Sequence, residues 1–114
     1  MSAESTALQP VMSMPDAEQD ARTAIHRGDE REALAILVRA FGPAVFRCCR
    51  TMIGATADAE DLMQITFLHL QRSLGSVAAQ PSIKAWLLVI ARHRCLDKIR
   101  ADRRRPRGDA DEFL

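Results

Sequence analysis

The 114-residue sequence predicts an all-α fold, a compact bundle of about four helices. Ala, Leu and Arg are abundant, Tyr is absent, and Gly and Pro number only five each, which favours helix over strand. In several segments, apolar residues recur at steps of three and four, the spacing of amphipathic helices. Hydrophobic residues make up 47% of the chain, enough for one core at this length. We therefore expect one helical domain.

The N-terminal region predicts an extension followed by a short helix. Residues 1–18 mix Ser, Pro, Met and acids without helical periodicity, so we expect a flexible extension, with order beginning near Ala17. Segment 17–27 can form a helix that ends at Gly28, because glycine tolerates the left-handed backbone that closes many helices. Asp29 is then expected to cap the next helix.

A second helical segment is expected over residues 30–53. Its apolar stripe is Ala33, Leu34, Leu37, Val38 and Phe41. The Gly-Pro pair at 42–43 interrupts this stripe, which then continues through residues 45–53 to Gly54. Proline suits a first helical turn, so we expect a slight bend at this pair.

The third helix is expected from Thr56 or Asp58, either of which could cap it, to Gly75. Its inward stripe has seven residues, Ala59, Leu62, Met63, Thr66, Phe67, Leu70 and Leu74. A loop over residues 75–80 then leads to Pro81 and Ser82, which can start a fourth helix. Trp86 belongs to the apolar stripe of that helix, so a core role is favoured over stacking on a bound partner.

The fourth helix ends as a dense cationic arm. Between Arg92 and Arg107 there are eight Arg or Lys residues against two Asp, although the formal net charge of the whole chain is only +1. Positive charge gathered at one end of one helix presents a local field to a polyanion, and nucleic acid is the commonest such partner. Pro106 and Gly108 are expected to terminate the helix, and the acidic residues 109–113 read as the start of a linker.

Several classes of function are disfavoured by composition. The first residues resemble neither a signal peptide nor a membrane anchor, and no apolar run reaches the length of a membrane span, so we expect a cytoplasmic protein. Cys48, Cys49 and Cys95 are odd in number, which argues against a disulfide framework. Their spacing relative to His69 and His93 suits zinc poorly, so we expect no metal and no cofactor.

Two motifs carry a specific resemblance. They are DAEDLMQITF at 58–67 and IKAWLLVIARHRCLDKIRADRRR at 83–105. The spacing between them and the upstream segment at 26–54, HRGDEREALAILVRAFGPAVFRCCRTMIG, carry the same resemblance. Together they resemble region 2 of bacterial sigma factors of the extracytoplasmic-function (ECF) group, over about residues 21–107. The resemblance implies a non-enzymatic helical module that docks on the clamp helices of core RNA polymerase and captures the promoter −10 element as it melts.

The resemblance assigns polymerase contact to the third helix. The residues at the matching positions are Asp58, Glu60, Asp61, Leu62 and Gln64. Exposed carboxylates could meet Arg side chains of the partner in bidentate pairs, although three acids at a helix start can also serve only the helix dipole. Ile65 departs from the family pattern, which usually has Glu there.

The resemblance assigns DNA contact to the fourth helix. The phosphate candidates are Arg92, Arg94, Lys98, Arg100, Arg103 and Arg104. A basic helix end can also merely complement the helix dipole and stay solvated, but eight cations exceed that need. His93 stands where many members have an Asn associated with base contact; a base role for His93 remains a hypothesis, since His can stack or donate a hydrogen bond.

The base-capturing loop of the family corresponds to residues 75–82. This loop has no aromatic residue, so capture would rely on backbone groups and on Ser76, Gln80 and Ser82 instead of the aromatic wedges of principal sigma factors.

The sequence therefore predicts an ECF sigma region 2 domain over 19–107, between an extension over 1–18 and a linker start over 108–114, with no region 4 present. The expected partners are core RNA polymerase, the non-template −10 strand and an anti-sigma factor. An exposed apolar face around Leu62, Ile65 and Leu68 would suit the anti-sigma factor. The competing interpretations are a helical protein-interaction domain with a basic tail and a metal- or redox-sensing regulator that acts through its cysteines.

Overall fold

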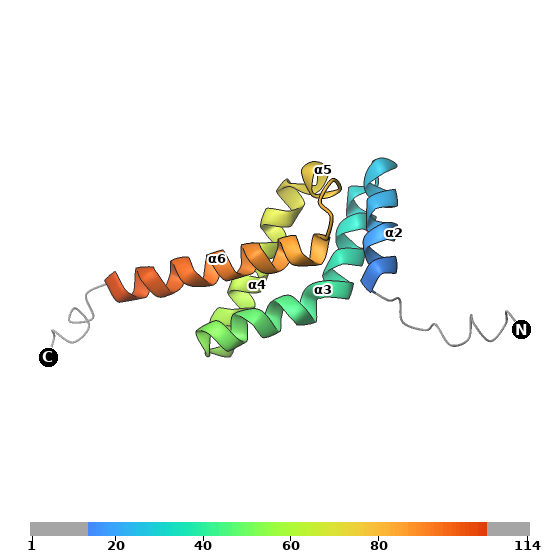
Figure 1. Cartoon of the computed structure of the whole chain (residues 1–114). Coiled ribbons are helices and arrows are strands. Elements are labelled where there is room, and N and C mark those ends of the chain that lie inside the picture. The colour runs from blue at the N-terminus through green and yellow to red at the C-terminus, as the bar shows by residue number, and fades with distance from the viewer. Residues whose placement is uncertain (1–13, 105–114) are drawn as a thin grey trace, which may run out of the picture.

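A computed structural model describes residues 14–104, which are helical except for short connections (Figure 1). The helices are α2 (Met14–His26), α3 (Glu30–Ile53), α4 (Thr56–Arg72), α5 (Leu74–Val77) and α6 (Ile83–Arg104). No strand occurs within this part of the chain, so the all-α prediction is confirmed. The predicted end of the last helix at Pro106 or Gly108 and the linker at 108–114 lie outside the described residues.

Helix α2 begins at Met14, three residues before the expected start of order near Ala17. The helix packs on α3 through small side chains, since Ala17, Ala21 and Ala24 are all fully buried. The missed turn consists of Met14, Pro15 and Asp16, which continue the Ser, Pro, Met and acid composition of the predicted extension, although proline suits a first helical turn. Residues 14–18 belong to the helix, and only residues 1–13 of the predicted extension stay outside the described part.

Helix α3 is the central element and packs against α2, α4 and α6. Asp29 caps its N-terminus as predicted, because its carboxylate accepts a hydrogen bond from the Glu32 N–H at 3.2 Å. The Gly-Pro pair at 42–43 does not end the helix, which bends visibly at mid-length (Figure 1). Proline lacks an N–H and its ring crowds the preceding turn, which explains the bend.

Helix α4 starts without either of the predicted side-chain caps. Ala55 occupies the cap position, and no side chain accepts a hydrogen bond there. The hydroxyl of Thr56 instead accepts a bond from Arg50 Nε at 3.2 Å, which ties the start of α4 to the end of α3. The helix ends at Arg72, three residues before the predicted Gly75, and is followed by α5.

The single-turn helix α5 occupies part of the segment expected to be a loop. Its Leu74 and Val77 are buried, so these side chains anchor the connection to the core. Helix α6 begins at Ile83, and Ser82 accepts a hydrogen bond from the Ala85 N–H at 3.1 Å, as expected for a capping residue.

The core lies where α3, α4 and α6 converge. The larger members of its buried cluster are Leu37, Phe41, Val45, Cys49, Leu62, Phe67, Leu70, Ile83, Leu87 and Cys95. Most of the predicted apolar stripes are therefore confirmed. Val38 is an exception, being 41% exposed beside α4. The C-terminal half of α6 runs out beyond α4, away from α2 (Figure 1). Among the described helices, none is both long and apolar enough to cross a membrane.

Candidate functional site

The predicted phosphate-binding residues of α6 differ in how free their charges are. Arg92 and His93 are exposed. Arg94 is half-buried, and its Nη2 lies 3.2 Å from Nδ1 of His69 on α4. The guanidinium of Arg94 is therefore partly committed to holding α4 and α6 together.

Two further predicted cations have acidic partners on the same helix. Lys98 Nζ lies 3.4 Å from Asp102 Oδ2, and Arg100 Nη1 lies 3.5 Å from Asp97 Oδ1. Arg103 and Arg104 are exposed and carry no ion pair within the described residues. The field of the arm is thus weakened in its middle by its own carboxylates.

Trp86 lies at the junction of α4 and α6. Its ring meets the His69 imidazole edge to face, with centroids 5.5 Å apart and planes at 79°. It is half-buried against the core, in agreement with the predicted packing role. Edge-to-face contacts between such rings are favourable because the positive edge of one meets the negative face of the other.

The residues predicted to capture a base lie in a segment that is tied down at its ends. The hydroxyl of Ser76 donates to the Ser73 carbonyl at 3.1 Å. Gln80 is half-buried, and its backbone N–H donates to the Val77 carbonyl at 2.9 Å. Since the hydroxyl of Ser82 is occupied as the cap of α6 and that of Ser76 by the Ser73 carbonyl, Gln80 has the freest side chain of the three within the described residues.

Sequence reasoning missed the two residues that position this segment, Glu18 and Arg22 on α2. The Glu18 carboxylate accepts hydrogen bonds from the backbone N–H groups of Ile83 and Lys84, at 2.9 and 3.0 Å. Arg22 donates to the carbonyls of residues 78, 80 and 81, most closely to Gln80 at 2.7 Å. The only sequence signal was an i, i+4 Glu-Arg pair, which does not reveal a partner about 60 residues away.

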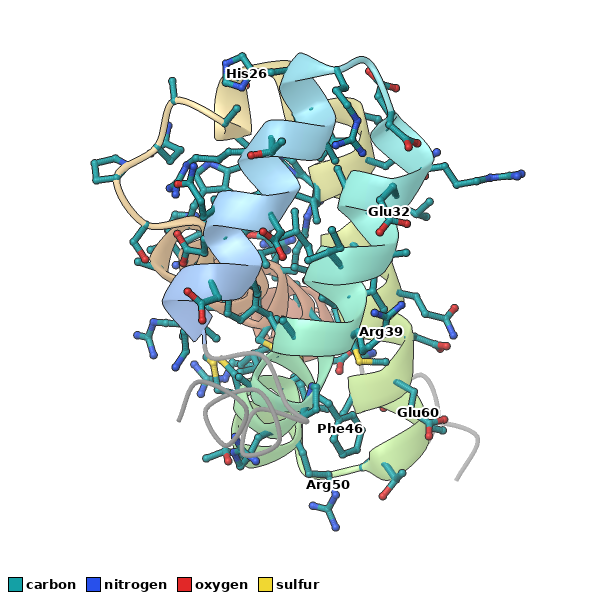
Figure 2. The ribbon with its side chains drawn as sticks, turned by 90° about the vertical axis from the view of Figure 1, so that its right-hand side faces the viewer. His26, Glu32, Arg39, Phe46, Arg50 and Glu60 are labelled. Atoms are coloured by element: carbon teal, nitrogen blue, oxygen red, sulfur yellow. The ribbon has the colours of Figure 1, made fainter. Side chains whose placement is uncertain are left out.

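The predicted polymerase-binding residues divide into exposed acids and a buried leucine. Glu60, Asp61 and Gln64 are exposed and Asp58 is partly exposed; Figure 2 shows Glu60 on the outer side of α4. Leu62 is 5% exposed and belongs to the core, so the expectation of an exposed face that includes Leu62 is wrong. The stripe had already placed Leu62 inward, and one side chain cannot serve both faces of a helix.

Two exposed apolar side chains remain on α4, and one of them, Leu68, lines a hollow against α3. Ile65 is 40% and Leu68 is 49% exposed. The hollow has a volume of ≈ 380 Å³, and its lining is Leu34, Val38, Met63, Gln64, Phe67, Leu68 and Gln71. An apolar surface therefore lies directly beside the acidic face of α4.

The cysteines gather between α3 and α6 as free thiols. Cys49 and Cys95 are fully buried. Burial raises the pKa of Cys49 to about 12, with a further contribution from the nearby Cys95 thiol, and burial also raises the pKa of Cys95. Such thiols are poor nucleophiles because they stay protonated. Within the described residues, no three His, Cys, Asp or Glu side chains are grouped so as to hold a metal ion.

Known proteins with similar sequences identify the family to which helices α4 and α6 belong. Residues 37–105 match the family described as Sigma-70 region 2. Over 58 residues, half of the chain, it is 40% identical to the ECF RNA polymerase sigma factor SigG of Mycobacterium tuberculosis. It is 37% identical to SigC of the same species over 66% of the chain, and 33% identical to BldN of Streptomyces coelicolor over 75%.

The chain spans less than half the length of these relatives, between 16% of SigG and 40% of SigC. No solved structure matches it. The family match covers more than half of the chain and includes all of α4 and α6. The chain therefore belongs to the sigma-70 family, as a region 2 domain of the ECF group.

Proposed function

We propose that this chain is the promoter-recognition domain of an ECF sigma factor, which acts in the bacterial cytoplasm. In this function α4 docks on the clamp helices of core RNA polymerase, and α6 recognises the promoter −10 element and helps to melt it. The observation that carries the proposal is the family match over 37–105, which contains both helices.

The polymerase contact is supported by the exposure of acids along α4. Glu60 and Asp61 are exposed and form no ion pair within the described residues, so both carboxylates are free to meet cations of a partner. Gln64 is exposed one turn further along. Carboxylate–Arg pairs beside an apolar surface bind strongly, because the apolar contact excludes water from them.

The DNA contact is supported by the exposed cations of α6. Arg92, Arg103 and Arg104 offer free guanidinium groups to phosphates, and exposed His93 can reach a base edge or stack on a base. Arg94, Lys98 and Arg100 would have to leave their present partners, so we assign them a smaller share of phosphate contact.

The polymerase assignment is tested by pull-down of core polymerase or of its clamp-helix fragment. We expect the wild type to bind and Asp61→Arg to abolish binding. Asp20→Arg, a charge reversal at an exposed position on α2, should leave binding intact. No binding by the wild type would instead favour a helical protein-interaction domain with a basic tail, the alternative that the family match disfavours.

The DNA assignment is tested by binding to labelled oligonucleotides. The domain should prefer an unpaired −10-like strand over the matching duplex. His93→Ala should alter discrimination among bases if His93 reads one of them. Unchanged base discrimination would remove His93 from the reading residues.

We also propose that an anti-sigma protein covers the apolar surface of α4. Ile65, Leu68 and the adjacent hollow offer the contact area, and this surface borders the acids proposed for polymerase binding. An inhibitor seated there should exclude the clamp-helix fragment, and Leu68→Glu should weaken its binding. Simultaneous binding of both proteins would contradict this proposal.

A further inference from the structure

A second hollow lies between α3 and the N-terminal half of α6, with a volume of ≈ 410 Å³. Cations line it from both helices. Arg47 comes from α3, and Lys84 and Arg92 come from α6, two helical turns apart on one face. We call this hollow the basic groove. Arg47 and Lys84 were not among the residues expected from the sequence to contact DNA.

The three cations of the basic groove are free of acidic partners. None of Arg47, Lys84 and Arg92 forms an ion pair within the described residues, and no acid lines the groove. This contrasts with the middle of the α6 arm, where Lys98 and Arg100 are paired. Uncompensated positive charge along α6 therefore lies beside α3 as well as at the C-terminal end of the helix.

The floor of the basic groove is apolar. Cys48, Met52 and Leu88 line it, and all three side chains are partly exposed. A single strand of nucleic acid offers phosphates together with unstacked bases, and so matches a surface that combines cations with an apolar floor. A duplex hides its base faces and could use only the cations at the rim.

A neighbouring hollow is less suited to a phosphate chain than the basic groove. It shares Met52 with the basic groove but is lined by Asp58 and Asp102 as well as Arg103, at the C-terminal half of α6. Carboxylates repel a phosphate chain, so the path from Arg92 is more favourable toward Lys84 and Arg47 than toward these acids.

We propose that the basic groove binds a segment of unpaired DNA, with Arg47, Lys84 and Arg92 on phosphates and with a base or sugar against Met52 and Leu88. This inference rests on the proposed function and extends its DNA-binding surface from α6 onto α3.

The test is fluorescence anisotropy with a labelled −10-like single strand at a series of salt concentrations. Arg47→Gln and Lys84→Gln should each weaken binding several-fold and lower the slope of log K against log salt by about 0.7, the value for one phosphate of a single strand. The matched control is Arg39→Gln, which removes an exposed Arg of the same helix outside the groove (Figure 2). This control should change neither quantity.

The outcomes separate the two proposals. If the wild type binds no single strand, the proposed function and the groove both fail. If the wild type binds and Arg103→Gln weakens binding while Arg47→Gln and Lys84→Gln do not, only the groove is overturned. The groove proposal would also be overturned if poly-glutamate of the same charge displaced the labelled strand as well as unlabelled DNA does, because an acidic polypeptide would then fit the groove equally.

Cys48 gives a direct readout at the groove. It is partly exposed there, whereas Cys49 and Cys95 are fully buried, so a maleimide should add once to the native protein, at Cys48. Saturating single-stranded oligonucleotide should slow this alkylation in the wild type and in Arg39→Gln. An unchanged rate in the presence of bound oligonucleotide would contradict the groove assignment.

Discussion

Glu18 and Arg22 form an ion pair, 3.1 Å between Oε1 and Nη2, and together they bind the backbone on both sides of the start of α6. Glu18 is 8% exposed and caps α6 through two N–H groups. Arg22 compensates the buried carboxylate and holds the carbonyls of the preceding loop. The pair thus sets the position of the predicted base-capturing segment from a helix that lies outside it.

Removal of the Glu18 carboxylate should destabilise the whole domain. Glu18→Ala deletes two charge-assisted hydrogen bonds to the α6 N-terminus and leaves Arg22 without its acid, so we expect a loss of about 2–3 kcal/mol. Urea unfolding followed by helical circular dichroism measures the change. Asp20→Ala, at an exposed position two residues along α2, should stay within about 0.5 kcal/mol, and equal losses in both variants would contradict the capping role.

Replacement of Arg22 should loosen the loop more than the fold. Arg22→Gln removes the donors that hold residues 78–81, while the Glu18 cap can remain. A loss of roughly 1.4 kcal/mol in local stability corresponds to about tenfold faster amide exchange. Hydrogen exchange at Ala78 and Gln80 should therefore accelerate relative to the core of α3. Uniform acceleration across the domain would indicate a global effect instead.

The helix pattern and most of the core were predictable because they rest on local periodicity. Leu37, Phe41 and Leu70 are buried where steps of three and four placed them. The start of α2 was missed because Met14, Pro15 and Asp16 have the composition of the preceding extension, although proline is compatible with a first helical turn. The α5 turn was missed because two apolar residues are too few to establish a period.

The candidate site was less predictable because its contacts join residues far apart in the sequence. The Glu18 cap crosses 65 residues, and the basic groove joins Arg47 of α3 to Arg92 of α6. A charge count on one helix cannot show that Lys98 and Arg100 are paired while Arg47 and Lys84 are free. The two ion pairs of α6 have the local i, i+3 and i, i+4 spacing that a charge count ignores, whereas only packing brings Arg47 beside Lys84 with no acid between them.

The buried thiol of Cys49 predicts a loss of stability at alkaline pH. Its pKa is about 12 in the fold against 9.0 ordinarily, so the unfolded chain ionises first. The protonated Cys49 thiol contributes fully to the free energy of unfolding below pH 9. This contribution is lost as pH rises from 9 toward 12, by up to about 1.4 kcal/mol per pH unit. Thermal unfolding between pH 8 and 10.5 should show this fall. The slope should be shallower in Cys49→Ala, and an identical slope would exclude this thiol as the cause.

The His69 imidazole should report on the α4–α6 junction. His69→Ala removes the edge contact to Trp86 and the partner of Arg94, so we expect a loss of about 0.5–1.5 kcal/mol and a red shift of Trp86 emission as water reaches the indole. Trp86 is the single Trp of the chain, which makes the emission specific. Exposed His93→Ala should show neither change.

The carboxylates of the arm should limit its affinity for DNA. Asp97→Asn and Asp102→Asn free Arg100 and Lys98, and because both pairs are exposed the cost in stability should be at most about 1 kcal/mol each. Affinity for a single strand should rise, and the salt slope should steepen by up to about 0.7 per cation that gains a phosphate. Asp20→Asn changes the net charge equally on α2. Equal gains from Asp20→Asn would mean that only the total charge matters, whereas a gain confined to Asp97→Asn and Asp102→Asn would locate the strand on α6.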